Sequence, residues 1–262
     1  MKSDKGTIRE HFDGYASSWH GRLKSYPYHA RREAVRKMLE GFQPAAAVDV
    51  GCGTGDYAPL FAPAVTRYTG IDLSENMIQH CRSLYPEYAF AVGDADKTGL
   101  PEEYADLVLS IAVLEYYENP EPHIRELDRI CKPGGQIIVA VPNGEDVSKN
   151  MEKKVLDLLK PLIGLKHRVL GRRGAEQGWG QGKEVLHVRF TEEEMTAIGK
   201  RFGMSLAETA FVNFQPLPRI FDQYLKLNER WSRLVASKGW ERRFKRSATI
   251  LVCRFTKNAG KA

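Results

Sequence analysis

The sequence predicts an α/β protein with a Rossmann-like, seven-stranded sheet that is mostly parallel, helices on both faces and a helical lid. Three observations lead to this prediction. Short apolar runs alternate with amphipathic stretches from about residue 46 to 142, which is typical of a parallel sheet covered by helices. A glycine-rich turn stands where the first strand should pass into a helix. With 262 residues, of which 42% are apolar, the chain is long enough to bury one full core.

Five strands of the expected sheet fall within this alternating region. They are predicted at 46–50, 67–72, 88–92, 105–110 and 136–141. Ser74 is a suitable cap for the helix after the second strand, because its side chain can accept a backbone N–H of the first turn. A helix over 121–131 is expected to stop at Pro133-Gly-Gly135.

The remainder of the chain is predicted to complete the sheet and to cover its ligand-binding edge. Thr191 begins a capping box for a helix that runs to about Phe202. Two late strands are expected at 206–214 and 248–255. One antiparallel strand is expected near the edge of the sheet. The expected parts are an N-terminal helical cap (1–45), a cofactor-binding core (46–142), a basic helical and glycine-rich lid (143–187) and the C-terminal part of the sheet (188–262) with a basic helical insertion at 216–247.

The net charge of +6 is unevenly distributed. Residues 147–173 carry eight Lys/Arg against two acids, residues 216–247 carry nine against three, and the remainder is therefore acidic. The basic segments favour an anionic partner, either the surface of an anionic membrane or, ranked lower because no RNA-binding module accompanies them, a nucleic acid. The plainer interpretation is that these lysines lie on a lid and contact only water.

The sequence has no apolar stretch long enough to span a membrane, no secretory signal and no paired cysteines. We therefore expect a cytoplasmic protein, which would be peripheral to the membrane if the basic segments bind lipid.

The glycine-rich turn, Asp49-Val-Gly51-Cys-Gly53-Thr-Gly55, lets the backbone turn tightly and lets a ligand lie against it. Asp72 at the end of the second strand can accept both ribose hydroxyls of an adenosine. The turn lacks the spacing that holds a pyrophosphate, and Asp49 would repel one. Asp94 after the third strand can accept the adenine amino group. Three carboxylates around one adenosyl ligand favour a cation, S-adenosylmethionine, over NAD.

Five segments in order resemble the motifs of class I S-adenosylmethionine-dependent methyltransferases, and in particular the branch that contains the ubiquinone-pathway O-methyltransferases. They are 48–55, 70–72, 92–94, 106–115 and 127–135. The resemblance implies that Gly51, Asp72 and Ile111 line the cofactor and that Arg31 contacts it from the N-terminal helix. The predicted cofactor site comprises Arg31, Asp49, Gly51, Gly53, Gly55, Asp72, Leu73, Met77, Asp94, Ala95, Ser110 and Ile111. Glu115-Tyr116 stands where the family commonly has Glu-His.

The predicted reaction is in-line O-methylation of a small or lipid-like acceptor, and no metal site is expected. A hydroxyl acceptor must lose its proton, and His20 and His187 are the candidate bases, although a single histidine is more often a surface or packing residue. Three alternatives stay open: a tRNA or other nucleic-acid methyltransferase, an N-methyltransferase acting on a small amine, and a non-catalytic adaptor that binds the cofactor.

Overall fold

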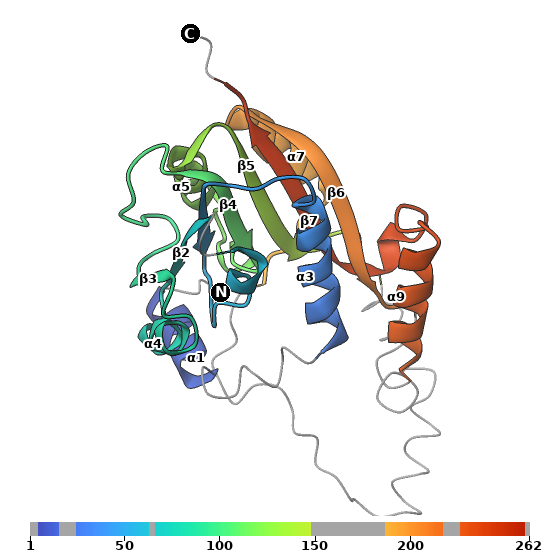
Figure 1. The fold of residues 1–262 in the computed structure, drawn as a ribbon. Helices are drawn as coiled ribbons and strands as arrows, with labels where there is room; N and C mark the ends of the chain where they lie inside the picture. The colour runs from blue at the N-terminus through green and yellow to red at the C-terminus, as the bar shows by residue number, and fades with distance from the viewer. Residues whose placement is uncertain (1–4, 16–24, 63–65, 148–186, 217–225, 260–262) are drawn as a thin grey trace, which may run out of the picture.

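The structure, a computed structural model, describes residues 5–15, 25–62, 66–147, 187–216 and 226–259 (Figure 1). The α-helices are α1 (Lys5–Tyr15), α3 (Tyr26–Met38), α4 (Glu75–Leu84), α5 (Glu121–Ile130), α7 (Glu192–Arg201) and α9 (Leu227–Ser237). The strands are β1 (Ala46–Val50), β2 (Arg67–Asp72), β3 (Ala89–Val92), β4 (Ala105–Ile111), β5 (Cys131–Pro142), β6 (Met204–Phe214) and β7 (Ala248–Lys257). Short 3-10 helices are η1 (Ala58–Leu60), η2 (Leu114–Tyr116) and η3 (Lys245–Ser247). Residues 148–186, which make up most of the predicted lid (143–187), lie outside the described residues.

The seven strands form one sheet in the order β3-β2-β1-β4-β5-β7-β6. Strands β1 to β5 pair in parallel, and β7 runs antiparallel to both of its neighbours. The predicted fold class is therefore confirmed. The fifth strand begins earlier than predicted, because Cys131 already has an extended backbone and pairs with Ala105. The preceding helix consequently ends at Ile130, before Pro133 and its glycines.

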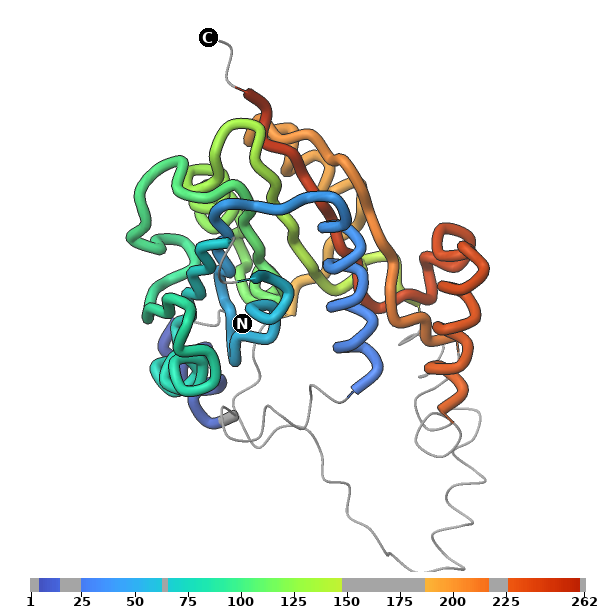
Figure 2. The backbone as a smooth tube through the Cα atoms, in the orientation of Figure 1, coloured from blue at the N-terminus to red at the C-terminus, as the bar shows by residue number. Residues whose placement is uncertain are grey.

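Two hydrophobic cores lie on opposite faces of the sheet, because successive strand residues point to opposite sides. One core joins the strands to α5, α7 and α9, and it includes Val48, Val108 and Leu127. The other joins them to α3 and α4, and it includes Ala47 and Leu107. Figures 1 and 2 show α3 running beside β7 and α1 lying next to α4.

Two helix starts follow the chemistry that the sequence predicts. Ser74 Oγ accepts a hydrogen bond from the Met77 amide at 3.2 Å, which caps α4. Thr191 and Glu194 form a complete capping box at the start of α7. Both predicted caps are confirmed, and the cap of α4 fixes the helix directly beyond the end of β2.

Candidate active site

A cavity of about 1080 Å³ lies at the edge of the sheet where β1 to β6 end and β7 begins. Its wall contains Gly51 after β1, Asp72 of β2, Gly93 after β3, Ile111 of β4, Pro142 of β5, Asn213 of β6 and Thr249 of β7. From β1 the chain adds β2 and β3 on one side, and it then returns to add β4 and β5 on the other side, so the strand order reverses between β1 and β4. Open α/β sheets bind ligands at the carboxyl ends of their strands at such a reversal.

The glycine-rich turn brings bare backbone into the cavity wall at Gly51 and Gly53. Gly51 has φ +79°, and a Cβ there would stand 2.2 Å from Val113 Cγ2, so no side chain fits. Gly53 has φ +53°, and a Cβ there would meet no atom within 4 Å. A side chain at Gly53 would therefore enter space that a ligand can use. Gly55, also predicted for the cofactor site, packs beside Tyr85 and is absent from the cavity wall.

Asp72 connects the glycine-rich turn to the start of α4. Its Oδ2 accepts the Gly53 N–H at 2.8 Å, and its Oδ1 accepts the Ser74 N–H at 2.9 Å. Burial raises the pKa of Asp72, although these backbone hydrogen bonds act in the opposite direction. Leu73 and Met77 line the cavity beside it. The carboxylate thus keeps lone pairs for a ligand while it holds the loop in place.

The other two predicted carboxylates are placed differently. Asp49 is 1% exposed within β1 and accepts a hydrogen bond from the Tyr68 hydroxyl at 2.8 Å. Burial raises its pKa to about 7. Asp94 lies 2.6 Å from the ammonium of Lys5 in α1. Burial alone would raise the pKa of Asp94, but the hydrogen bond from Lys5 lowers it. Neither side chain belongs to the cavity wall, so Asp72 is the one predicted carboxylate that the structure brings there.

Ala95 and Ile111 line the cavity, as a cofactor site at the strand ends requires. Ser110 does not, because its side chain lies on the other face of β4 from that of Ile111. The Ser110 hydroxyl is 2.8 Å from Nε2 of His123 in α5. Ser110 could therefore contact a ligand only through its backbone atoms.

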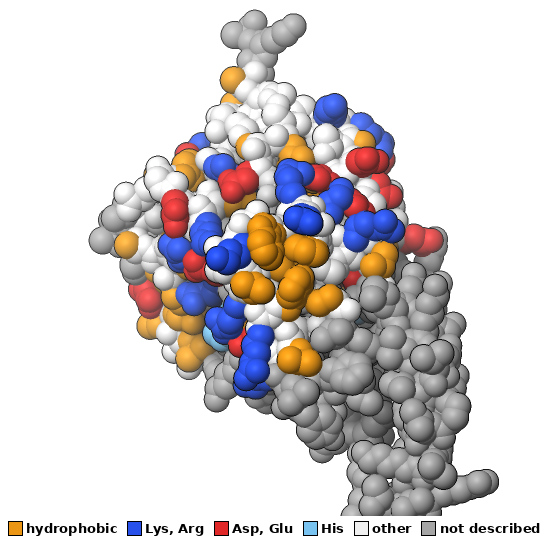
Figure 3. All heavy atoms as spheres, turned by 90° about the vertical axis from the view of Figure 1, so that its right-hand side faces the viewer, with side chains coloured by type: hydrophobic (Ala, Val, Ile, Leu, Met, Phe, Trp, Pro, Cys, Tyr) orange, Lys and Arg blue, Asp and Glu red, His pale blue; other side chains and the backbone are white. Residues whose placement is uncertain are grey.

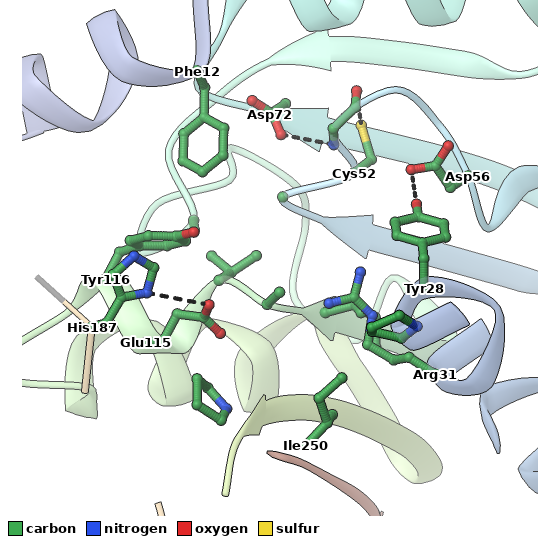
Figure 4. Close-up of a pocket in the computed structure, with 18 of the residues that line it drawn as sticks. Phe12, Tyr28, Arg31, Cys52, Asp56, Asp72, Glu115, Tyr116, His187 and Ile250 are labelled. Carbon is green, nitrogen blue, oxygen red and sulfur yellow. Dashed lines mark hydrogen bonds and ion pairs between the residues drawn. The ribbon is translucent and has the colours of Figure 1, made fainter. Parts of the chain in front are cut away.

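Arg31 reaches the cavity from α3, where sequence resemblance placed a cofactor contact. Its guanidinium stands over the ring of Tyr28 at 5.1 Å, and its Nε donates a hydrogen bond to the Tyr57 hydroxyl at 3.3 Å. Tyr28 in turn donates to Asp56 (Figure 4). Tyr28 and Tyr57 thus hold the Arg31 guanidinium at the cavity wall. Among the described residues, Arg31 forms no ion pair with a carboxylate.

A second polar group lies across the cavity from Asp72 (Figure 4). His187 Nδ1 is 3.7 Å from Glu115 Oε1, and the imidazole packs on the Tyr116 ring with centroids 5.0 Å apart. Glu115 is 7% exposed, and all three residues line the cavity. The sequence pointed to Glu115 only as part of a departure from the family pattern. His20, the other predicted base, lies outside the described residues.

Two non-glycine residues in the cavity wall have left-handed backbones: Ala112 with φ +59° and Asn213 with φ +59°. Asn213 lies in β6 between Val212 and Phe214, which pair with Ile250 and Ala248 of β7, and its Nδ2 donates to Thr249 Oγ1 at 2.6 Å. Left-handed backbone costs such residues about 1–2 kcal/mol and is found preferentially at functional sites. Sequence reasoning missed Asn213 and Thr249, and the tolerance of Asn for this conformation was the only signal present.

Comparison with known proteins agrees with this geometry. Residues 48–139 match a family model described as a methyltransferase domain. Over 114 residues the chain is 32% identical to a protein of Mycolicibacterium smegmatis named as a probable S-adenosylmethionine-dependent methyltransferase; the match covers 44% of this chain and 41% of that protein. Over 120 residues it is 31% identical to the malonyl-[acyl-carrier protein] O-methyltransferase of Erwinia pyrifoliae, covering 44% and 46%. The matched region thus spans less than half of each of these relatives.

The solved structure of magnesium protoporphyrin IX methyltransferase from Synechocystis, with bound S-adenosylhomocysteine, has the same fold. The TM-score is 0.61 at 18% identity, over 97% of this chain and 100% of that one. The strand order, the cavity at the strand ends and the matched motifs agree with one another. The chain contains a class I S-adenosylmethionine-dependent methyltransferase domain.

Proposed function

We propose that the chain transfers a methyl group from S-adenosylmethionine to an oxygen of a small or lipid-like acceptor. The observation that carries the proposal is one cavity with two chemically different ends. At one end Asp72 and the glycine-rich turn form a wall that suits an adenosyl group, and at the other Glu115 and His187 form an acid–base pair. The name of the Erwinia relative supports an oxygen acceptor.

At the cofactor end, the residues present suit an adenosyl ligand with a charged amino acid tail. We assign the cofactor to the wall formed by Gly51, Gly53, Asp72, Leu73, Met77, Ala95 and Ile111. Arg31 would pair with the carboxylate of the amino acid tail, because its cation reaches the cavity and forms no ion pair with a carboxylate among the described residues. Asp49, Gly55, Asp94 and Ser110 would act from behind the wall by supporting these residues.

S-adenosylmethionine supplies a methyl group that its sulfonium charge has already activated. The protein therefore contributes mainly by aligning the acceptor in line with the methyl group and by excluding water. A hydroxyl acceptor must also lose its proton. We assign this step to His187, with Glu115 orienting the imidazole and stabilising its charge after the proton arrives.

Methyl-labelled S-adenosylmethionine tests the assignment. The protein is incubated with hydroxylated lipids and small molecules, with small amines and with tRNA, and label is then measured in each fraction. Transfer to a hydroxylated compound supports the proposal. Transfer to tRNA alone indicates a nucleic-acid methyltransferase, transfer to amines indicates N-methylation, and cofactor binding without transfer in any arm indicates an adaptor.

A surface beside the acceptor end supports peripheral contact with an anionic membrane. We call it the α9 surface: α9, Lys238–Phe244 and η3. Trp240 is 39% exposed and Leu234 is 41% exposed, and both lie among arginines and lysines. Figure 3 shows hydrophobic side chains gathered on this side of the molecule with basic side chains around them. No helix among the described residues is long and apolar enough to cross a bilayer. Exposed apolar side chains among basic ones suit attachment to an anionic lipid surface.

The α9 surface is joined to residues of the cavity wall. The Ser232 hydroxyl donates to the Phe214 carbonyl at 2.8 Å, between wall residues Asn213 and Gln215. The Arg233 guanidinium stands over the Tyr26 ring at 5.0 Å, and Tyr26 adjoins Pro27 of the wall. A lipid-like acceptor at the membrane surface would therefore be close to the acceptor end. The other predicted basic segment, 147–173, lies almost wholly outside the described residues.

A further inference from the structure

His123 makes a set of buried contacts that the proposed chemistry does not use. It is 0% exposed in α5, and its Nδ1 is 2.9 Å from the carbonyl oxygen of Ala95. Its Nε2 is 2.8 Å from Ser110 Oγ. One face of its ring stacks on Tyr117, with centroids 5.3 Å apart and planes 13° from parallel. The imidazole thus connects α5 to the end of β4, to the loop after β3 and to the segment after η2.

The partners determine the tautomer of this imidazole. A carbonyl oxygen only accepts, so Nδ1 must carry the proton that is donated to Ala95. Nε2 then accepts the Ser110 hydroxyl proton. Burial lowers the pKa of His123 to about 4, which keeps the ring neutral near pH 7 and preserves this pattern. His123 therefore has one fixed donor and one fixed acceptor.

Two of the groups held by His123 belong to the cavity wall. Ala95 and Tyr117 both line the cavity, whereas His123 itself does not. Ala95 follows Asp94 in the loop after β3, and Ile111 of the wall follows Ser110. A shift of the imidazole would move wall residues from three separate segments together.

We propose that His123 is a positioning residue for the adenosyl end of the cavity. It fixes the Ala95 carbonyl and the Tyr117 ring, and these form the wall against which the adenosyl group binds. This inference rests on the proposed cofactor site and adds to it a residue that touches no ligand. It predicts that loss of His123 weakens cofactor binding and leaves methyl transfer from the bound cofactor largely intact.

The two amide replacements separate the two hydrogen bonds. In His123→Asn, the amide can take the place of Nδ1 and keep the donation to Ala95; in His123→Gln, the amide reaches the place of Nε2 and leaves the Ala95 carbonyl without its donor. Leu127→Ala is the matched control, because Leu127 is equally buried in the same helix but its aliphatic side chain makes no hydrogen bond to the cavity wall. It should lower Tm without changing cofactor affinity.

The experiment is calorimetric titration of each full-length variant with S-adenosylhomocysteine and with adenosine, alongside Tm. We expect His123→Gln to bind both compounds about tenfold more weakly, the scale of one buried hydrogen bond, and His123→Asn to remain within about threefold of wild type. kcat at saturating cofactor should change much less than KM for the cofactor. Equal affinities in wild type and His123→Gln would overturn this inference but not the proposed cofactor site. The same holds if the loss of affinity follows the loss of Tm in every variant, Leu127→Ala included. Failure of wild type to bind either compound would overturn the proposed cofactor site as well.

Discussion

The Asp72 carboxylate accepts a hydrogen bond from the Gly53 amide at 2.8 Å, which joins the end of β2 to the turn after β1. Both residues line the cavity, so one contact shapes two parts of the proposed cofactor site. The carboxylate has a double function in this arrangement: it stabilises the left-handed turn at Gly53 and presents its remaining lone pairs to the ligand. Changes at either residue should therefore affect cofactor affinity strongly.

Asp72→Ala should weaken cofactor binding by about 1–3 kcal/mol, because hydrogen bonds to a charged group are lost and the Gly53 and Ser74 amides lose their acceptor. Asp72→Asn keeps one acceptor oxygen and should have a smaller effect. Calorimetry with S-adenosylhomocysteine gives both affinities. Unchanged affinity in Asp72→Ala would contradict the ribose role.

Gly53→Val should abolish cofactor binding, because its side chain would project into open space of the cavity. The control is Gly203→Val. Gly203 also has a left-handed backbone, φ +67°, and a Cβ there would meet no atom within 4 Å, but it lies outside the cavity wall. Both variants should lose similar stability from backbone strain, about 1–2 kcal/mol. If both variants bind S-adenosylmethionine equally well, Gly53 does not face the ligand.

His187→Ala should lower kcat by about 10²–10⁴-fold, the usual contribution of a general base, while the Kd for S-adenosylhomocysteine stays near that of wild type. Glu115→Gln should lower kcat less, because the imidazole remains but loses its charged neighbour at 3.7 Å. Single-turnover rates measured with bound cofactor separate chemistry from binding. Wild-type rates in His187→Ala would exclude this histidine as the base.

Asp49 should make the stability of the protein depend on pH. Burial raises its pKa to about 7 from an ordinary value of 3.8, so the folded state holds the proton more tightly than the unfolded chain. Its effect is most favourable below about pH 4, and stability should fall as the pH rises from about 4 to about 7, by up to about 4 kcal/mol. Asp49→Asn should lack this fall. The free energy of unfolding, measured in denaturant across this range, should give a flatter profile for the variant; parallel profiles would contradict the assignment.

The α9 surface should bind anionic vesicles. A Leu234→Ser/Trp240→Ser double variant should sediment less than wild type with vesicles of phosphatidylglycerol and phosphatidylcholine, since it loses the exposed apolar groups. Leu84→Ser is the matched control: Leu84 is 44% exposed in α4, well away from α9 (Figure 1). Equal sedimentation of the three proteins, or sedimentation equally strong with purely zwitterionic vesicles, would argue against the proposed membrane contact.

Local patterns predicted the parts of the site that one stretch of chain determines. The sheet, the glycine-rich turn, the Ser74 cap and the place of Asp72 all follow from periodicity and spacing over a few residues. These patterns do not by themselves show whether a side chain near a strand end points into the cavity. Asp49 and Ser110 lie next to strand ends in sequence, but the alternation of side chains turns Ser110 toward His123, and Tyr68 covers Asp49.

Contacts between distant segments could not be predicted in this way. Lys5 meets Asp94, and Glu115 meets His187, only after the whole sheet has formed. The hydrogen bond from Asn213 to Thr249 depends on how β6 pairs with β7, which no local pattern reveals. The acceptor end of the cavity is built almost entirely from such contacts, and for this reason the sequence indicated the cofactor more clearly than the acceptor.

The central claim is that Asp72 and the glycine-rich turn hold an adenosyl sulfonium at the carboxyl ends of the strands. Equilibrium dialysis of the purified protein against S-adenosylmethionine, S-adenosylhomocysteine, NAD and ATP measures this selectivity. We expect saturable binding of the first two compounds and much weaker binding of NAD and ATP. Equal affinity for all four, or preference for either nucleotide, would contradict it.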